Sequence, residues 1–255
     1  MLATLLAIGL VLSQAEPSMA RAGWDLHLDG VVISVRGTED DAAVREQVRR
    51  VLPGAVRSAA RWGRLPPVIA LGVHATHAEL EDATGRRGRP WMRAWARTGA
   101  VDLQSPRTWS RGRATDAALG QILAHELTHC VLFAATGRDG RSHAVPPWFV
   151  EGMASVAAGE QHRVARPEGV TEPLALQRAD PDAFYGTADR AFRDLVARFG
   201  EPGVRRVVSR LGEGHAFPVA FEGELGVSPA DFEADLVRRL TALAGATTAP
   251  ASPSR

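Results

Sequence analysis

Two histidines and a glutamate within one short stretch have the residue types and spacing needed to activate water on a metal ion. The stretch is His125-Glu126-Leu127-Thr128-His129, an HExxH motif. Residues four apart lie on the same face of a helix, about one turn from each other, so both imidazoles can bind one Zn²⁺ while Glu126 lies beside them. Zinc lowers the pKa of a bound water to about 7, and a nearby carboxylate can take the proton. The motif therefore predicts a hydrolytic zinc site that needs a third ligand.

The sequence around the motif favours this interpretation. A helix is expected from Asp116 to Ala135, with Thr115 as its N-cap and Gly137 at its far end. Two histidines and a glutamate inside an apolar helix would be costly without a partner such as a metal. The apolar residues that surround the motif are Leu119, Ile122, Leu123 and Leu127.

Several residues could supply the third ligand. A metzincin would have a histidine six residues after His129, but position 135 is Ala, which excludes that class. His143 and His162 are possible on spacing alone. Glu151 is the better candidate, with 21 residues between it and His129. Its neighbours are nearly all apolar, so an ordinary surface helix is not favoured there.

Glu151 lies in the stretch Pro147-Trp148-Phe149-Val150-Glu151-Gly152-Met153-Ala154. Pro146 and Pro147 predict the start of a second helix, with Glu151 in its first turn.

HExxH followed about twenty residues later by Trp-x-x-Glu-Gly-x-Ala resembles the gluzincin metallopeptidases. The second element is similar to the Trp-Leu-Asn-Glu-Gly-Phe-Ala element of the alanyl-aminopeptidase and leukotriene-hydrolase families. In size and layout, the chain resembles the small peptidase-MA-like domains of bacterial exported proteins, most closely from Asp116 to Gly159. The resemblance implies that His125, His129 and Glu151 bind one zinc ion per chain and that Glu126 is the general base.

The same resemblance implies roles around the metal. The strand before the active helix should line the cleft and pair with an extended substrate, and Ala100 to Gln104 occupy that place. The oxyanion needs a donor beyond the metal. Tyr185, the only Tyr of the chain, is the first candidate, and His215 is its rival. Ser155 is a candidate to orient a ligand histidine, because thermolysin-like relatives carry an Asp at the matching place.

The elements that would position these residues begin with strands. Alternation of apolar and polar residues from Trp24 to Val35 around Asp29-Gly30 predicts a hairpin. Helical spacing extends from Asp41 to Trp62, with an interruption expected at Pro53-Gly54. Pro67 to Val73 and Ala100 to Leu103 are expected to be short strands.

Helices dominate the second half of the chain. Thr187 to Phe199 predicts a helix that Gly200 ends, and Ser228 should cap the last helix. This order predicts an α+β, zincin-like fold in one domain over 21–244. A lobe with a small mixed sheet and the active-site helix is expected at about 21–137, and a mainly helical lobe at about 138–244.

The ends of the chain predict export and a tail. Leu2 to Leu12 form an apolar run of eleven residues, and Ser18-Met19-Ala20 has the small-x-Ala form of a signal-peptidase site. A bilayer span needs about 20 residues, so 1–20 are expected to be a signal peptide and no stable membrane span is expected. The protein is therefore expected in the periplasm or outside the cell, with 245–255 as a flexible tail.

Composition excludes several other classes of site. The 255 residues include 30 basic ones, all of them Arg, against 29 acidic ones, with no Lys, no Asn and one Cys. Sites that need a lysine, such as phosphate-binding loops of the Gly-Lys-Ser type, and sites built from several thiolates are excluded. The net charge of +1 indicates no nucleic-acid partner.

One stretch departs from this balance. Arg86 to Arg113 contains eight Arg and one acid, with Trp91, Trp95 and Trp109 between them. It could dock anionic lipid, cell-wall polymer or acidic peptide. The favoured interpretation is a solvated loop whose Trp91 and Trp95 pack on the domain.

Taken together, these features predict zinc-dependent hydrolysis of peptide bonds in a peptide or protein substrate. The resemblance favours an endopeptidase, because the Gly-x-Met-Glu-Asn element with which aminopeptidases hold a free amine is absent. The main alternative is a zincin-fold domain that binds an envelope partner with little or no catalysis. Hydrolysis of a non-peptide amide is a third possibility. The intact set of His125, Glu126, His129 and Glu151 favours the enzyme.

Overall fold

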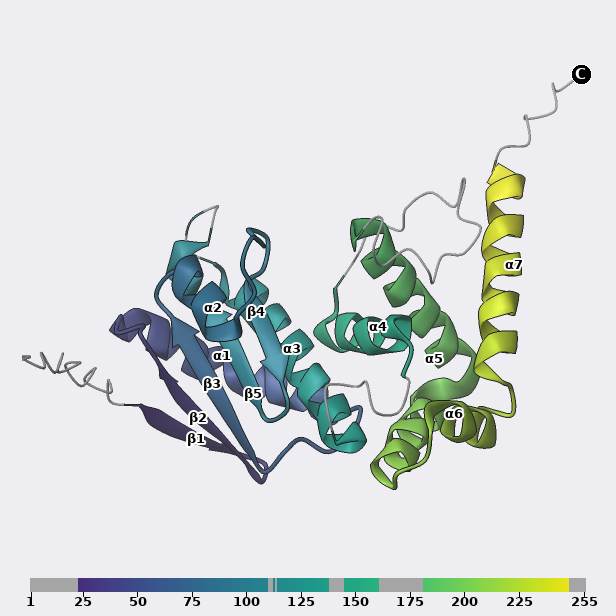
Figure 1. The fold of residues 1–255 in the computed structure, drawn as a ribbon, viewed down its shortest axis with the longest axis horizontal. Helices are drawn as coiled ribbons and strands as arrows, with labels where there is room; N and C mark the ends of the chain where they lie inside the picture. The colour runs from purple at the N-terminus through teal and green to yellow at the C-terminus, as the bar shows by residue number, and fades with distance from the viewer. Residues whose placement is uncertain (1–22, 110–111, 113, 138–144, 161–180, 248–255) are drawn as a thin grey trace, which may run out of the picture.

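The computed structural model describes residues 23–109, 112, 114–137, 145–160 and 181–247. A sheet lobe is followed by a lobe of helices, as Figure 1 shows. The strands are β1 (Trp24–Leu28), β2 (Val31–Gly37), β3 (Val68–His74), β4 (Ala94–Arg97) and β5 (Ala100–Gln104). The helices are α1 (Ala42–Ala60), α2 (His77–Thr84), α3 (Asp116–Thr136), α4 (Pro147–Ala158), α5 (Pro181–Gly212), α6 (Phe217–Leu225) and α7 (Pro229–Thr247). The predicted α+β class, with a small mixed sheet and a mainly helical C-terminal part, is confirmed.

The sheet has the order β1-β2-β3-β5-β4. β1 and β2 form the predicted hairpin, in which Asp29 and Gly30 adopt φ values of 46° and 83°. Positive φ at both residues is typical of the two-residue turns that connect hairpin strands, because the twist of such a turn matches the twist of the strands. β2, β3 and β5 run parallel, and β4 returns antiparallel to β5 at the edge. The buried strands β3 and β5 therefore lie where short apolar runs predicted strands.

The order of the strands shows that the expected substrate-pairing strand was wrong. Ala100 to Gln104 was expected to pair with the substrate, but β5 lies inside the sheet between β3 and β4. Both of its edges are therefore already paired. Among the described strands, β1 and β4 form the two edges of the sheet, and β4 is the edge strand that packs against α3. β4 was not predicted from the sequence because it has only four residues.

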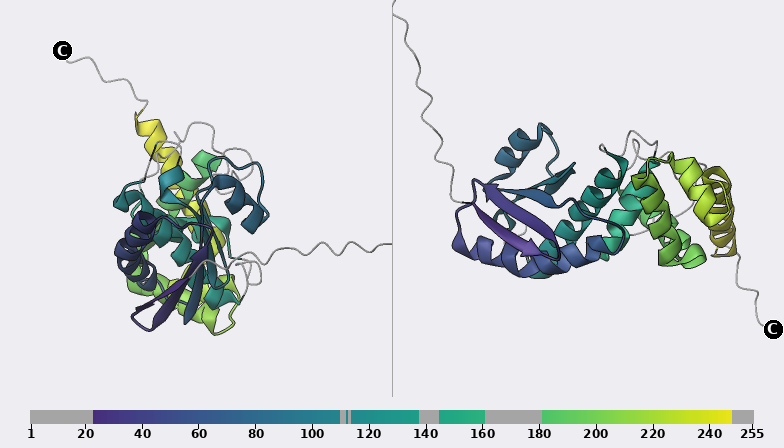
Figure 2. Two further views of the ribbon diagram at one scale, coloured as in Figure 1. Left: turned by 90° about the vertical axis from the view of Figure 1, so that its left-hand side faces the viewer. Right: turned by 90° about the horizontal axis from the view of Figure 1, so that it is seen from below.

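Helices cover both faces of the sheet. α1 and α3 pack against each other on one face, whereas α2 lies on the other, as Figure 2 shows. α4 and α5 then pack together and join the helical lobe to α3. α3 is long and apolar enough to cross a membrane by length and composition alone, but 56% of its most apolar window is buried within the protein. Buried core helices pass the same test.

Two helices continue through residues expected to interrupt them. α1 runs through Pro53. The apolar face of α1 is buried, and its tertiary packing outweighs the lost backbone hydrogen bond. Gly200 has φ 71° and ψ 156° and breaks the helical geometry of α5, but the chain resumes as a helix to Gly212. The buried residues of α1 are Val44, Gln47, Val48, Leu52, Ala55, Val56 and Ala59.

The last helix begins as predicted and ends later than expected. Ser228 Oγ accepts a hydrogen bond from the Asp231 amide at 3.1 Å, which is N-cap geometry. α7 extends to Thr247, so residues 245–247 are helical and do not belong to a tail. The expected signal peptide, at 1–20, and the rest of the tail lie outside the described residues.

The glycine of the Glu-Gly pair has a packing role between α4 and α5. A Cβ added at Gly152 would lie 2.3 Å from the Ala188 carbonyl oxygen and 2.7 Å from Cβ of Phe192. These are backbone and near-backbone atoms of α5, so neither can yield by a rotamer change. Only glycine lets the two helices approach this closely while holding Glu151, the adjacent residue, in place.

We expect Gly152→Ala to destabilise the protein by up to about 2 kcal/mol, because overpacking costs as much as about 3 kcal/mol and the better helix propensity of Ala returns about 1 kcal/mol. Urea unfolding followed by circular dichroism measures the change. Gly223→Ala in α6 is the matched control, since an added Cβ there meets no atom within 4 Å. That variant should be neutral or slightly more stable, and an equal loss in both variants would contradict the packing role.

Candidate metal centre

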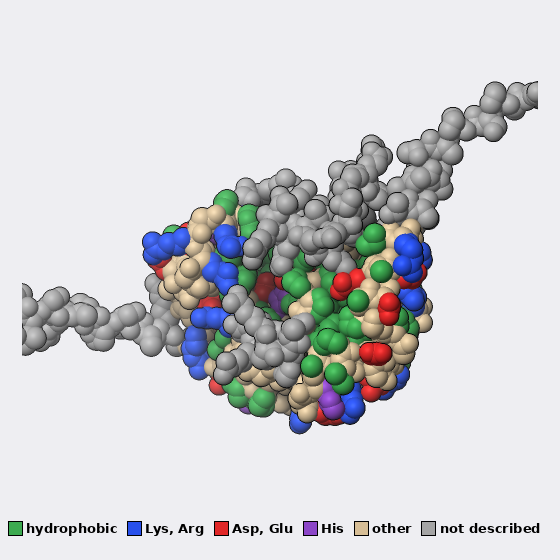
Figure 3. Space-filling model, turned by 45° about the vertical axis from the view of Figure 1, so that its right-hand side comes forward, with side chains coloured by type: hydrophobic (Ala, Val, Ile, Leu, Met, Phe, Trp, Pro, Cys, Tyr) green, Lys and Arg blue, Asp and Glu red, His purple; other side chains and the backbone are tan. Residues whose placement is uncertain are grey.

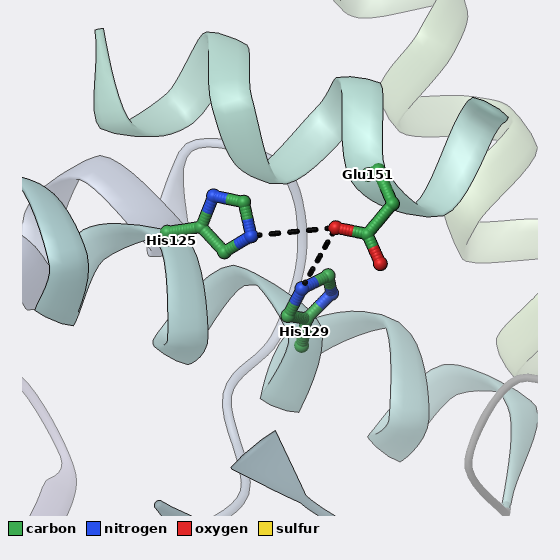
Figure 4. A group of neighbouring side chains, drawn as sticks. All are labelled: His125, His129 and Glu151. Carbon is green, nitrogen blue, oxygen red and sulfur yellow. Dashed lines mark ion pairs between the residues drawn. The ribbon is translucent and has the colours of Figure 1, made fainter. Parts of the chain in front are cut away.

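α3 carries the two histidines of the motif on one face. Thr115 Oγ1 accepts from the Ala118 amide at 3.2 Å, and Gly137 ends the helix in a left-handed conformation. Both expected ends are therefore present. The rings of His125 and His129 lie 4.8 Å apart between centroids, at 79° to each other. Their edges converge on one point beside the helix, as Figure 4 shows.

Glu151 of α4 completes a group of three at that point. Its Oε2 lies 3.4 Å from His125 Nε2 and 3.5 Å from His129 Nε2. One ligand atom from each of the three residues lies within 4.8 Å of the others. Tetrahedral ligands at about 2.0–2.1 Å from zinc are separated by about 3.4 Å. The donor types and the two Glu151 distances therefore fit a zinc ion.

The charges within this group shift the pKa values of Glu151 and His125. Burial would raise the pKa of Glu151, but the imidazoles of His129 and His125 hold it far below its ordinary value. Burial would lower the pKa of His125, but hydrogen bonds to Glu151 and Glu160 raise it well above its ordinary value. The carboxylate thus needs adjacent positive charge, which imidazole protons or a divalent cation could supply.

Glu126 lies next to this group and against the free edge of β4. Its carboxylate accepts a hydrogen bond from the Ala96 backbone amide. Burial raises the pKa of Glu126 above its ordinary value, although the nearby imidazoles of His129 and His125 oppose this. α3 is also fixed under the turn after β4, because Cys130 Sγ lies 3.6 Å from the Arg97 carbonyl oxygen. A carboxylate between a candidate metal site and a strand edge is in a position to take a proton from a water molecule.

Tyr185 lies near the start of α5. Burial raises the pKa of its phenol, and the negative charges of Glu151 and Glu126 raise it further. The phenol therefore remains protonated at neutral pH and can act as a hydrogen-bond donor. The phenol is thus near enough to both carboxylates for their charges to raise its pKa.

The other residues that the sequence offered for the site are not joined to the candidate centre or lie outside the described residues, apart from Ser155 in α4. His215 lies three residues after the end of α5, at the opposite end of the helix from Tyr185, and its Nε2 lies 3.7 Å from Glu213 Oε2. No interaction joins His215 to the candidate centre in the described part of the chain. His143 and His162 lie outside the described residues. Ser155 is fully buried within α4.

Besides Glu151, Glu160 also contacts a histidine of the motif. Its Oε1 lies 3.1 Å from His125 Nδ1, the nitrogen that faces away from Glu151. Gly159 ends α4 in a left-handed conformation, and this turn directs Glu160 back to α3. The Glu160 carbonyl oxygen accepts from Arg193 Nη2 at 2.7 Å, and Arg193 also pairs with Asp189 at 2.9 Å. Sequence reasoning missed Glu160; an acid directly after the helix-ending glycine is the signal that could have found it.

The two histidines of the motif therefore have different surroundings. His129 Nδ1 is buried and makes no hydrogen bond within the described residues. His125, in contrast, is held between two carboxylates. A carboxylate on the remote nitrogen of a ligand histidine fixes the tautomer that presents the other nitrogen to a metal.

Comparison with known proteins adds a loose structural likeness. No protein-family model matches the chain, and no curated protein is significantly similar to it. Among solved structures, it is similar to an M1 zinc metallopeptidase from Deinococcus radiodurans, with 12% identity and a TM-score of 0.42 over 90% of this chain and 52% of that one. A mutant of a two-domain M1 zinc metallopeptidase bound to L-tryptophan matches with 12% identity and a TM-score of 0.41, over 92% and 53% of the two chains.

The chain thus spans about half the length of these solved structures. Their likeness is too loose to assign an activity. The functional argument therefore rests on the geometry around His125, His129 and Glu151.

Glu160→Gln should weaken zinc binding by about 10–100-fold, because an amide does not fix the His125 tautomer as a carboxylate does. Competition with a chromogenic chelator measures the zinc Kd. Glu222→Gln, at an exposed position of α6, is the matched control and should not change it. An unchanged Kd in Glu160→Gln, with the fold intact, would show that Glu160 does not position His125.

Proposed function

We propose that this protein is a zinc-dependent peptidase of the gluzincin type that hydrolyses peptide bonds with Glu126 as general base. One observation carries the proposal. Glu151 Oε2 lies 3.4 and 3.5 Å from the two imidazole nitrogens of the motif, at the spacing of zinc ligands, and Glu126 lies beside them on a strand edge. His125, His129 and Glu151 would hold the ion.

A bound zinc ion would supply Lewis-acid chemistry, by polarising the substrate carbonyl and making water more acidic. The protein's own groups do the rest. Glu126 takes a proton from the attacking water at a carboxylate oxygen and later gives it to the leaving amine nitrogen. The Ala96 amide holds this carboxylate in position. A raised pKa for Glu126 suits both proton transfers near neutral pH.

Tyr185 and β4 would bind the reacting peptide. The protonated phenol of Tyr185 can donate to the oxygen of the carbonyl under attack, where negative charge develops. The edge of β4 can pair with an extended peptide backbone. Glu160 acts on His125 and is a positioning residue in this scheme.

We propose an endopeptidase, as the sequence favours, because no strand of the described residues pairs with the outer edge of β4. We also propose that the protein is exported, on the grounds of residues 1–20. N-terminal sequencing of the exported protein should give Arg21, the residue after Ser18-Met19-Ala20, or Glu16, the residue after the similar triplet Ser13-Gln14-Ala15.

The purified protein, loaded with zinc, should contain one zinc per chain and should cleave an unfolded, alkylated protein. Dipicolinic acid should remove the metal and stop cleavage, and added zinc should restore both. Metal content by mass spectrometry and fragments by gel electrophoresis are the two measurements. An aminoacyl p-nitroanilide, assayed in parallel, tests for aminopeptidase activity.

Each other outcome has a definite meaning. Stable zinc binding without cleavage of any peptide would reject the peptidase and favour a domain that binds an envelope partner. Cleavage of the aminoacyl substrate alone would reject the endopeptidase. Cleavage that does not depend on zinc would reject the metal mechanism.

A further inference from the structure

The connection between α2 and β4 is strongly basic. Five Arg and no acid lie between positions 86 and 97. Two of the five pair with carboxylates: Arg87 with Asp82 at 2.5 Å, and Arg97 with Asp102. The expectation that both tryptophans of this stretch pack on the domain is wrong for Trp91, which is 55% exposed.

The remaining three guanidinium groups have other surroundings. Arg86 stacks on Trp95 at 3.5 Å from the ring centroid, and Arg93 donates to the Pro90 and Met92 carbonyl oxygens. Arg89 lies 5.8 Å from the centroid of Trp91. No carboxylate of the described residues pairs with Arg89. A guanidinium beside an exposed indole without a paired acid is suited to bind an anionic group from outside.

This connection has a fixed course. Gly85 ends α2 in a left-handed conformation, and the Arg89 amide donates to Glu81 Oε1 at 3.2 Å. The Met92 amide then donates to the Arg89 carbonyl oxygen at 2.9 Å. The backbone on both sides of the Arg89 side chain is therefore held by hydrogen bonds.

The basic connection borders the candidate centre. Arg89 is close enough to Tyr185 for its charge to lower the pKa of the phenol, in opposition to Glu151. Figure 3 shows basic side chains on the sheet lobe beside a hollow that contains acidic and histidine side chains, with apolar side chains on the opposite wall. An occupant of the hollow would therefore meet positive charge on one side.

The free edge of β4 fixes which part of a peptide meets this charge. The Gln104 amide donates to the Arg93 carbonyl oxygen at 2.8 Å, so the backbone groups of residues 93, 95 and 97 face β5. Those of Ala94 and Ala96 face outward, in agreement with the hydrogen bond from Ala96 to Glu126. A peptide that extends the sheet in the antiparallel sense, with its reacting bond beside Ala96 and Glu126, directs its C-terminal residues past Ala94 toward Arg93 and Arg89.

We infer that the Arg89 rim, defined as Arg89, Trp91 and Arg93, selects peptides that carry Asp or Glu on the C-terminal side of the cleaved bond. The inference rests on the proposed function and names its substrate class. A carboxylate can form a charge-assisted hydrogen bond with the planar guanidinium of Arg89 while its methylene groups cover Trp91. An acidic peptide is favoured over an anionic lipid because the rim continues directly into the strand edge beside Glu126.

The test uses a matched pair of peptides. A bond cleaved in the unfolded protein is placed in two short fluorogenic peptides that differ only by Glu or Gln at the second residue after the bond. The Glu peptide should have a kcat/KM about fivefold higher, the upper range for a partly exposed charge pair. Arg89→Gln should reduce this ratio to near one. Arg87→Gln, in the same connection but paired with Asp82, is the matched control and should keep the ratio.

Binding provides a readout that is independent of turnover. Fluorescence anisotropy on zinc-loaded Glu126→Gln protein should show the same preference for the Glu peptide, and the preference should fall with added salt. If no peptide is cleaved, the proposed function fails, and the same binding measurement with any extended peptide that carries Glu or Gln at one position still decides whether Arg89 selects acidic peptides.

Three results would overturn the inference. The first is an equal kcat/KM and equal affinity for the two peptides. The second is an acidic preference that Arg89→Gln leaves unchanged or that lies on the N-terminal side of the bond. The third is binding to phosphatidylglycerol vesicles that Arg89→Gln abolishes while the peptide ratio stays at one.

Discussion

Glu126→Gln should lower kcat/KM for peptide hydrolysis by about 10²–10⁴-fold, the contribution of a general base. The amide keeps the size of the side chain but cannot take a proton from water. Because Glu126 is not among the three residues whose atoms converge, zinc content should remain at one per chain. The measurements are kcat/KM on a fluorogenic peptide and bound zinc by mass spectrometry, on the same preparation.

The control for this change is Glu222→Gln, on an exposed face of α6 far along the chain from the motif. It should keep both activity and zinc. Circular dichroism should show Glu126→Gln folded, since the Ala96 amide can still donate to the remaining side-chain oxygen. Full activity in Glu126→Gln would exclude it as the base. Loss of zinc together with activity would instead make Glu126 part of the metal site.

The sequence predicted the elements that carry the centre because their signals are local. Thr115 and Gly137 mark the ends of α3, and a pair of prolines marks the start of α4. His125 and His129 are neighbours through helical geometry alone. The approach of Glu151 to them depends on the packing of α4 against α3, which the spacing of the motif indicated and the structure places at 3.4–3.5 Å.

The sequence did not predict the features that depend on packing between distant parts of the chain. β4 is short, and its place at the edge follows from the pairing of β5 with β3, which no local pattern encodes. The substrate strand was therefore assigned to β5. Glu160 contacts His125 only because the chain turns back after Gly159, and the resemblance directed attention to Ser155. Pro53 was given its usual weight as a helix breaker, whereas the buried face of α1 overrides it.

The close approach of α4 to α5 connects the fold to the centre. Gly152 lets α4 lie against Ala188, and Arg193 of α5 binds the Glu160 carbonyl oxygen at the end of α4. α5 therefore holds α4 directly beside Glu151 and again at the C-terminal end of the helix. Rigid support of this kind allows three side chains from two helices to hold the geometry that a metal requires.

Glu151→Ala should abolish stable zinc binding and, with it, hydrolysis. Two imidazoles remain as ligands, and the loss should exceed the roughly 10–100-fold that a change in an outer carboxylate such as Glu160 causes. The zinc Kd from chelator competition is the measurement. Glu151→Gln, nearly equal in size, separates the loss of a charged ligand from the loss of packing in this buried part of α4. Both variants should fold, as circular dichroism can check. Tight binding of one zinc by either folded variant would mean that a different residue completes the centre, and the proposed ligand set would be wrong.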